Sequence, residues 1–170
     1  MLSFRQARHL RLERIRGQVT LLPSDPARRL EVAISGDRHA VRLPDGQVMI
    51  GATFQPGDED MTVRVADHAE NLAGLESMLP GFCASASPAT LTGRTGIRAA
   101  TPDRMPLFGA LSGSTIAAPN LYVASGLGAR GLVWAPLGAE LLAAQIAGEP
   151  WPVARELAQA VAPGRFAGRY

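Results

Sequence analysis

The sequence contains no lysine, a single cysteine and no long hydrophobic run. Cys83 has no second cysteine with which to form an internal disulfide or a metal site, and His9, His39 and His68 are scattered without ligand spacing. No apolar run approaches the roughly 20 residues that a membrane-spanning helix needs, and the basic N-terminus lacks the apolar core of a signal peptide. These absences predict a soluble, cytoplasmic protein without a structural metal.

The charge is nearly balanced, although every basic residue is an arginine. The chain of 170 residues carries 17 arginines against 15 acidic residues, so its formal net charge is +2. The arginines are dispersed, and aromatic residues do not interleave with them as in a platform for stacking nucleic-acid bases. Composition alone therefore indicates an ordinary surface, on one domain or two small lobes whose 46% hydrophobic residues can build a core.

The first half of the chain has the pattern of short strands joined by turns. The expected strands are residues 17–22, 30–35, 39–43, 47–54 and 61–66. Pro44, Asp45 and Gly46 form a tight-turn sequence, which predicts an antiparallel hairpin between the third and fourth strands. The first half therefore predicts an antiparallel sheet.

A helical pattern follows in residues 67–79. Leu72, Leu75 and Met78 fall at helical spacing, and Pro80 marks the end. Asp67 and Glu70 resemble a capping box at the start. We therefore expect an amphipathic helix that packs on the sheet.

Residues 93–111 are rich in glycine, proline and arginine, and they predict a crossing segment without regular structure. After this segment, residues 121–125 predict a buried strand and residues 132–146 predict a helix. The strand has no predicted parallel neighbour in this chain. Either the first sheet accepts this strand, or the chain is part of something larger.

Between that strand and helix, Gly126, Gly128 and Gly131 match the spacing G-x-G-x-x-G. A dinucleotide site also needs a second parallel strand that ends in an acidic residue about 20 positions later. The proline-containing tail after Gly148 offers no such strand, so the Rossmann interpretation fails. What remains is a glycine turn at a helix N-terminus, where a ligand can approach the backbone and negative charge is favoured.

Five segments, taken in order, resemble consecutive motifs of the D-amino-acid-oxidase-like flavoenzymes. They are residues 16–23, 45–54, 67–80, 93–111 and 121–152. Within this superfamily, the sequence most resembles the oxidoreductase domain of the bifunctional tRNA 5-methylaminomethyl-2-thiouridine biosynthesis proteins. The motifs "DHAENLAGL", "GARGL" and "APGRF" carry that resemblance, which extends over nearly the whole chain from about Leu12.

The resemblance implies an α+β fold. Residues 1–95 would form part of an antiparallel substrate-binding lobe with a packed helix, and residues 96–170 would form the C-terminal part of the FAD-binding lobe, with its terminal strand, turn and helix. In this family the ADP half of FAD is held by an upstream glycine turn in a Rossmann half, which this chain is expected to lack. A methyltransferase domain is also expected to be missing. We therefore expect this chain alone to bind FAD weakly or not at all.

The same resemblance assigns the site residues. The turn that faces the pyrimidine edge of the flavin consists of Gly126, Leu127, Gly128, Ala129, Arg130, Gly131 and Leu132. Arg98 matches the position that holds a substrate carboxylate, for which a guanidinium fork is well suited. Arg130 could reach the substrate or a tRNA phosphate, or point to solvent. The resemblance supplies neither a dedicated catalytic base nor a metal ligand.

The implied reaction is a flavin-dependent C–N oxidation on tRNA. The carboxymethyl group of 5-carboxymethylaminomethyluridine, at the wobble position, would leave as glyoxylate and give 5-aminomethyluridine. Two alternatives stay open. The chain could be a fragment of a small-molecule amine or amino-acid oxidase of the glycine or sarcosine type, or it could be a non-catalytic remnant or binding module.

Overall fold

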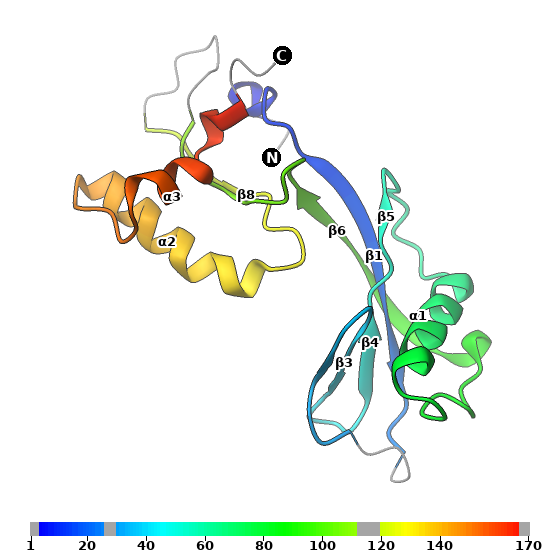
Figure 1. Cartoon of the computed structure of the whole chain (residues 1–170). Coiled ribbons are helices and arrows are strands. Elements are labelled where there is room, and N and C mark those ends of the chain that lie inside the picture. Colours follow the sequence, from blue (N-terminus) through cyan, green and yellow to red (C-terminus); the bar gives the residue numbers. More distant parts are fainter. Residues whose placement is uncertain (1–3, 26–29, 112–119, 167–170) are drawn as a thin grey trace. The chain divides into compact units, whose positions relative to one another are not determined.

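The computed structural model describes residues 4–25, 30–111 and 120–166 (Figure 1). The chain forms two compact units. We call Ile15–Ile97 the sheet unit, and Met1–Arg14 together with Arg98–Tyr170 the turn unit. Strands β1 (Glu13–Leu22) and β6 (Thr92–Ala100) run from one unit into the other along the chain. The predicted lobes, 1–95 and 96–170, stay a prediction.

The sheet unit is built on a six-stranded sheet with the order β2-β3-β4-β1-β5, in which β6 also pairs with β1. The remaining strands are β2 (Ile34–Ser35), β3 (His39–Arg42), β4 (Val48–Gly51) and β5 (Gln55–Pro56). The predicted hairpin is confirmed, because β3 and β4 pair antiparallel and the Gly46 N–H donates to the Leu43 carbonyl at 3.0 Å. The predicted strands 30–35 and 47–54 are shorter than expected.

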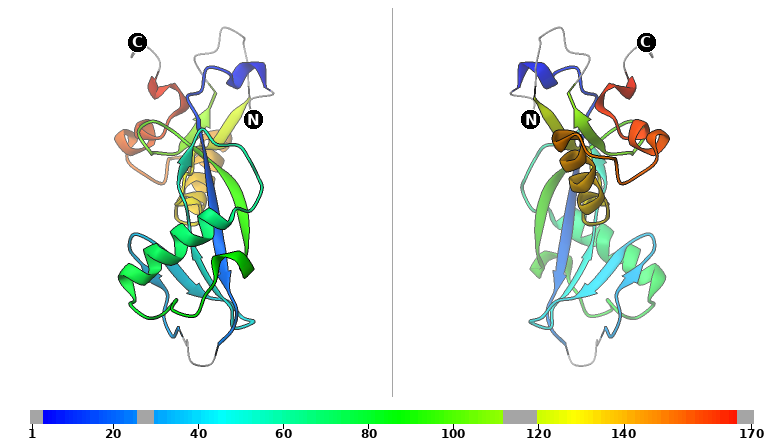
Figure 2. Two further views of the ribbon diagram at one scale, coloured as in Figure 1. Left: turned by 90° about the vertical axis from the view of Figure 1, so that its right-hand side faces the viewer. Right: turned by 90° about the vertical axis from the view of Figure 1, so that its left-hand side faces the viewer.

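Helix α1 (Val65–Met78) lies across one face of this sheet (Figure 2). Leu72 and Leu75 are buried there in one cluster with Ala40, Val48 and Ile50. Alternate residues of β3 and β4 face this cluster, as expected for a sheet with one face on the core. The predicted packing of an amphipathic helix on an antiparallel sheet is therefore confirmed.

Two expectations at the start of α1 are wrong. Residues 61–66 form no strand, because α1 begins at Val65 and Thr62 is held in a turn by hydrogen bonds to the Asp60 side chain. The capping box is absent as well, since Arg64 is the N-cap residue and makes no side-chain cap. The Asp67 carboxylate turns instead to the buried guanidinium of Arg16.

The predicted irregular segment 93–111 contains β6 and β7 (Leu107–Ala110), so that expectation is also wrong. One of its glycines, Gly93, serves close packing and so helped to conceal the strand. A Cβ at Gly93 would lie 2.2 Å from the Val19 carbonyl oxygen of β1. Glycine at this position permits the two backbones to approach.

In the turn unit, β8 (Tyr122–Ser125) pairs antiparallel with β7 in the register Leu107↔Ser125 to Ala110↔Tyr122. The strand expected at 121–125 is therefore present, and its neighbour within the chain is antiparallel. Leu107 is buried against Leu10, Leu111 and Val123, whereas its neighbour Phe108 is buried in a second cluster. The small sheet is thus covered by side chains on both faces.

Helix α2 (Gly131–Ala147) packs on β7 through the ring of Phe108. The second cluster joins Phe108 to Leu141 of α2, to Ala158 of helix α3 (Arg155–Ala160) and to Val161. Short 3₁₀ turns complete the described elements, namely η1 (Arg5–Ala7), η2 (Pro88–Thr90) and η3 (Pro163–Phe166). Among the described residues, no helix could cross a membrane.

The first prediction concerns the buried ion pair of the sheet unit. Replacing Asp67 by alanine removes the countercharge of the fully buried Arg16, and an uncompensated buried charge costs about 3–5 kcal/mol. We expect the free energy of unfolding, measured with urea, to fall by that amount. Glu70→Ala on the same helix removes an exposed partner of Arg38 and should cost at most about 1 kcal/mol. Equal losses in the two variants would contradict this account.

The second prediction concerns Gly138 of α2. A Cβ at this position would lie 2.2 Å from ring carbons of Phe108, which is buried and cannot retreat freely. Gly138→Ala should therefore lower the free energy of unfolding by about 1–3 kcal/mol through overpacking. At Gly96 a Cβ would meet nothing within 4 Å, so Gly96→Ala is the matched control. An unchanged midpoint in Gly138→Ala would refute the predicted contact.

Candidate cofactor and substrate site

The glycine turn leaves β8 through two residues with left-handed backbone. Gly126 has φ +70° and Gly128 has φ +55°, a region that other residues enter only with strain. Gly126 also lacks room for a side chain, because its Cβ would lie 3.0 Å from Cγ2 of Thr101. The fold therefore requires glycine at both positions.

Gly131, the third glycine of the pattern, is different. It is the first residue of α2, its φ lies outside the left-handed region, and a Cβ there would meet only Leu127 at an ordinary 3.8 Å. Neither the backbone nor the packing of the described residues requires glycine here.

The N-terminus of α2 lies at the end of this turn. The Arg130 carbonyl accepts hydrogen bonds from the N–H groups of Val133 and Trp134, so the N–H groups of Gly131 and Leu132 precede the first helical bonds. The first turn contains no acidic residue to offset the positive end of the helix. Leu132 and Val133 are 95% and 74% exposed. This surface suits an apolar group that carries negative charge.

Pro136 does not lie in the first turn of α2, where its missing N–H would cost little. The helix begins at Gly131, so Pro136 is its sixth residue, and the Leu132 carbonyl lacks the helical donor that another residue would provide. Gly148, with φ +70°, ends the helix close to the predicted stop.

The structure brings the strand of Arg98 against the turn. The Gly128 N–H donates to the Ala99 carbonyl at 3.0 Å, and Ala100 forms an antiparallel bridge with Leu127. Arg98 precedes these two residues in β6. Two predicted site segments, 30 residues apart in the sequence, are therefore joined by backbone contacts.

Arg98 itself is half-buried. Burial lowers the pKa of its guanidinium from the usual value, because desolvation disfavours the charged form. An arginine remains protonated even so. A partly desolvated, permanently charged fork is well suited to a carboxylate.

Arg130 occupies the N-cap position of α2 but makes no side-chain cap. The residue is exposed. Contact of its side chain with the substrate, with a tRNA phosphate or with solvent alone therefore stays a prediction. Its backbone N–H donates to the Leu127 carbonyl at 3.1 Å and closes the turn.

Sequence reasoning missed the role of Arg165, which contacts the loop 101–106 between β6 and β7. Asp103 accepts a local backbone hydrogen bond from Met105, and it also receives two hydrogen bonds from Arg165, at 2.8 and 2.9 Å. The Arg165 pair holds the pKa of the Asp103 carboxyl well below its usual range. The ending "APGRF" contributed only to the family resemblance, and no periodic signal linked it to residue 103.

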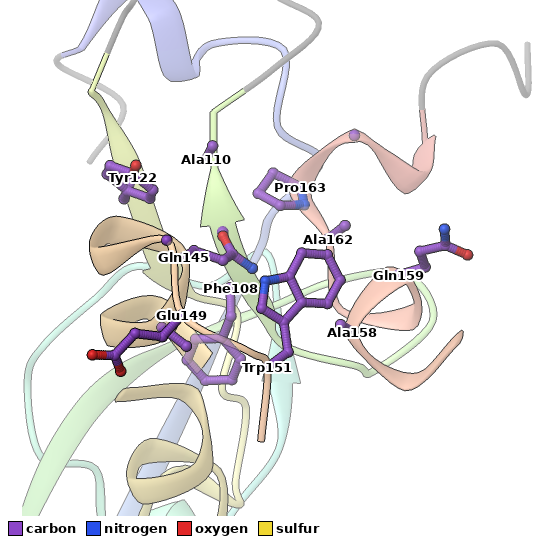
Figure 3. Close-up of a pocket in the computed structure, with 14 residues that line it drawn as sticks. Phe108, Ala110, Tyr122, Gln145, Glu149, Trp151, Ala158, Gln159, Ala162 and Pro163 are labelled. Atoms are coloured by element: carbon purple, nitrogen blue, oxygen red, sulfur yellow. The ribbon is translucent and has the colours of Figure 1, made fainter. Parts of the chain in front are cut away.

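The turn unit also contains a hollow of about 510 Å³, which the glycine turn does not line (Figure 3). Tyr122, Gln145, Trp151 and Pro163 are among its lining residues, and none of residues 126–132 lines it. Size alone therefore does not identify the candidate site. Among the described residues, no group of histidine, cysteine or carboxylate side chains could hold a metal ion.

Comparison with known sequences identifies a family and several relatives. The family model of the FAD dependent oxidoreductases (DAO) matches residues 1–145. Over 94% of its length the chain is 48% identical to the tRNA 5-methylaminomethyl-2-thiouridine biosynthesis bifunctional protein MnmC of Burkholderia cenocepacia (strain HI2424), and 47% identical to that of Burkholderia mallei (strain SAVP1). It spans only 28% and 27% of those proteins.

Solved structures share the fold. Iminodiacetate oxidase (IdaA) from Chelativorans sp. BNC1 is 27% identical, with a TM-score of 0.68 over 91% of this chain and 40% of that one. Glycine oxidase from Geobacillus kaustophilus is 20% identical, with a TM-score of 0.68 over 88% of this chain and 39% of that one. Because the family model matches residues 1–145 and the Burkholderia cenocepacia protein is 48% identical over 94% of this chain, the chain belongs to the FAD-dependent oxidoreductase family.

Proposed function

We propose that this chain supplies the flavin-facing turn and the carboxylate-binding arginine of an oxidoreductase that acts on tRNA. Its substrate would be 5-carboxymethylaminomethyluridine at the wobble position, and its products glyoxylate and 5-aminomethyluridine. The observation that carries the proposal is the backbone contact between the Gly126–Gly131 turn and the strand of Arg98. The 48% identity to the tRNA-modifying proteins favours tRNA as the substrate.

The described residues fit the flavin on three counts. Gly128 leaves open space beside the backbone, a Cβ at Gly131 would make only an ordinary contact with Leu127, and Leu132 offers an exposed apolar side chain to a ring system. The N-terminus of α2 presents N–H groups without an acidic neighbour. These donors suit the pyrimidine edge, which becomes negative when the ring is reduced.

A bound flavin supplies the acceptor for a hydride from the carbon between the amine and the carboxylate. Arg98 holds that carboxylate through two parallel N–H···O bonds and so orients the adjacent carbon. Loss of the hydride leaves an imine, and water hydrolyses it to glyoxylate and the free amine. If the amine binds as the neutral species, no dedicated base is required.

A small-molecule oxidase is the second candidate, and the likeness to iminodiacetate oxidase favours it. Iminodiacetate and the proposed tRNA side chain are both N-carboxymethyl amines, so one arginine could orient either. Glyoxylate release distinguishes the two. With tRNA and iminodiacetate compared at equal concentration, activity on iminodiacetate alone would favour the second candidate.

The third prediction tests Arg98. In the flavin-loaded protein, Arg98→Ala should lower kcat/KM for the modified tRNA at least about 100-fold, because two charged hydrogen bonds contribute about 1.5–3 kcal/mol each. Arg94→Ala is the matched control, since Arg94 is an exposed arginine of the same strand. An unchanged kcat/KM in Arg98→Ala would defeat the assigned role.

The fourth prediction separates the three glycines. Gly126→Ala and Gly128→Ala should lower the free energy of unfolding by at least about 1 kcal/mol, because both force alanine into the left-handed region. The loss should be greater at Gly126, where the methyl group also meets Thr101.

Gly131→Ala should leave stability unchanged or raise it by up to about 1 kcal/mol, since it fits the helix. In the full-length protein it should nevertheless weaken flavin binding at least tenfold, which a flavin-release titration measures. Full flavin affinity in Gly131→Ala would argue against a ligand at this turn.

A further inference from the structure

Arg165 makes an unusually complete set of contacts for a residue so near the end of the chain. Its guanidinium donates to both carboxylate oxygens of Asp103 and to the carbonyl oxygens of Met105, Pro106 and Ala162, at distances from 2.7 to 3.2 Å. It also lies 4.4 Å from the ring centroid of Phe166. The side chain is about 10% exposed, so these contacts are partly shielded from water.

Three of these four acceptor residues, Asp103, Met105 and Pro106, lie in one loop, residues 101–106. This loop contains Arg104, which has a left-handed φ of 59° and occupies a conformation that needs external support. The Thr101 hydroxyl donates to the Met105 carbonyl at 2.6 Å and draws the two ends of the loop together. Arg165 therefore holds the loop from outside while Thr101 closes it from within.

Thr101 connects this loop to the glycine turn. Its Cγ2 lies 3.0 Å from the place where a Cβ of Gly126 would stand, so its methyl group packs directly on the bare backbone of the turn. The preceding residues, Ala99 and Ala100, make the hydrogen bond to Gly128 and the bridge to Leu127. These contacts join the end of β6 to the turn.

The segment that bears Arg165 is itself anchored to the small sheet. The Phe108 N–H donates to the Val161 carbonyl at 2.9 Å, and Pro163 is buried beside Gly109. Figure 3 shows Pro163 and Ala162 on the wall of the hollow next to β7. The backbone next to Arg165 is thus anchored to β7 while the guanidinium contacts the loop.

From these contacts we infer that Arg165 is a positioning residue for the glycine turn. It fixes the loop 101–106, and through Thr101 it fixes the distance between the turn and the strand of Arg98. Its effect on cofactor and substrate would be transmitted through the turn. The inference that this geometry matters for flavin chemistry rests on the proposed function.

Lysine could not take this role. One ammonium group could pair with Asp103, but it has three donors on one nitrogen and cannot span a carboxylate and several carbonyl groups at once. Arg165→Lys should therefore keep the charge and only part of the positioning. Asp103→Asn removes the carboxylate partner of Arg165, so it should also loosen the loop 101–106.

The test measures hydrogen exchange in the full-length flavin-loaded protein. In Arg165→Ala, amides of residues 126–130 should exchange at least tenfold faster, while the buried middle of α2 around Leu141 keeps its rate. Arg165→Lys should give an intermediate rate. Arg155→Ala, which removes an exposed arginine of α3, should have no effect. Unaltered exchange at 126–130 in Arg165→Ala, with the loop 101–106 loosened, would overturn the inference.

A second measurement separates this inference from the proposed function. If the turn faces the flavin, Arg165→Ala should shift the midpoint potential of the bound flavin to a lower value, because misplaced donors stabilise the reduced ring less. In Arg165→Lys the midpoint potential should be lowered less than in Arg165→Ala. Coupled exchange without any change of potential would refute the flavin role and leave the positioning intact. Uncoupled exchange would refute the positioning even if Gly131→Ala weakens flavin binding.

Discussion

The sheet unit depends on one buried charge. Arg16 is completely inaccessible to solvent, and its guanidinium donates to Asp67 of α1, to Gln55 of β5 and to the carbonyl groups of Asp60 and Thr62. A buried guanidinium is tolerated only when its countercharge and its acceptors are all in place. Arg16 can therefore be accommodated only if β1, β5, the loop before α1 and α1 itself come together, and this requirement fixes their arrangement.

The turn unit repeats this arrangement on a smaller scale. Arg165, like Arg16, combines one carboxylate partner with several main-chain carbonyl groups of a loop that has no regular structure of its own. A planar fork with five donors can do this, whereas a lysine ammonium cannot. Since the chain has no lysine, all of its cationic contacts are made by arginine, and in both units arginine substitutes for secondary structure in holding a loop.

The three glycines of the turn show why a sequence pattern is ambiguous about function. Gly126 and Gly128 are explained by backbone conformation, and Gly126 also by its contact with Thr101. Gly131 is explained by neither. For the third glycine, the structure removes both the conformational and the packing explanation that the sequence pattern leaves open. The same spacing in a plain strand-to-helix turn would read identically in the sequence.

The sequence by itself determined the local elements whose signals are local. The hairpin at Pro44–Gly46 follows from turn residues, the central part of α1 from apolar spacing, and the β8–turn–α2 order from a strand, glycines and a helix in succession. Only tertiary structure decided where β6 and β7 form and what Asp67 and Arg165 contact. The partners of Asp67 and Arg165 lie 51 and 62 residues away, and the partner strand of β7 lies 12 to 18 residues away. No local pattern records such partners, because hydrogen bonds and buried charges are satisfied by proximity in space.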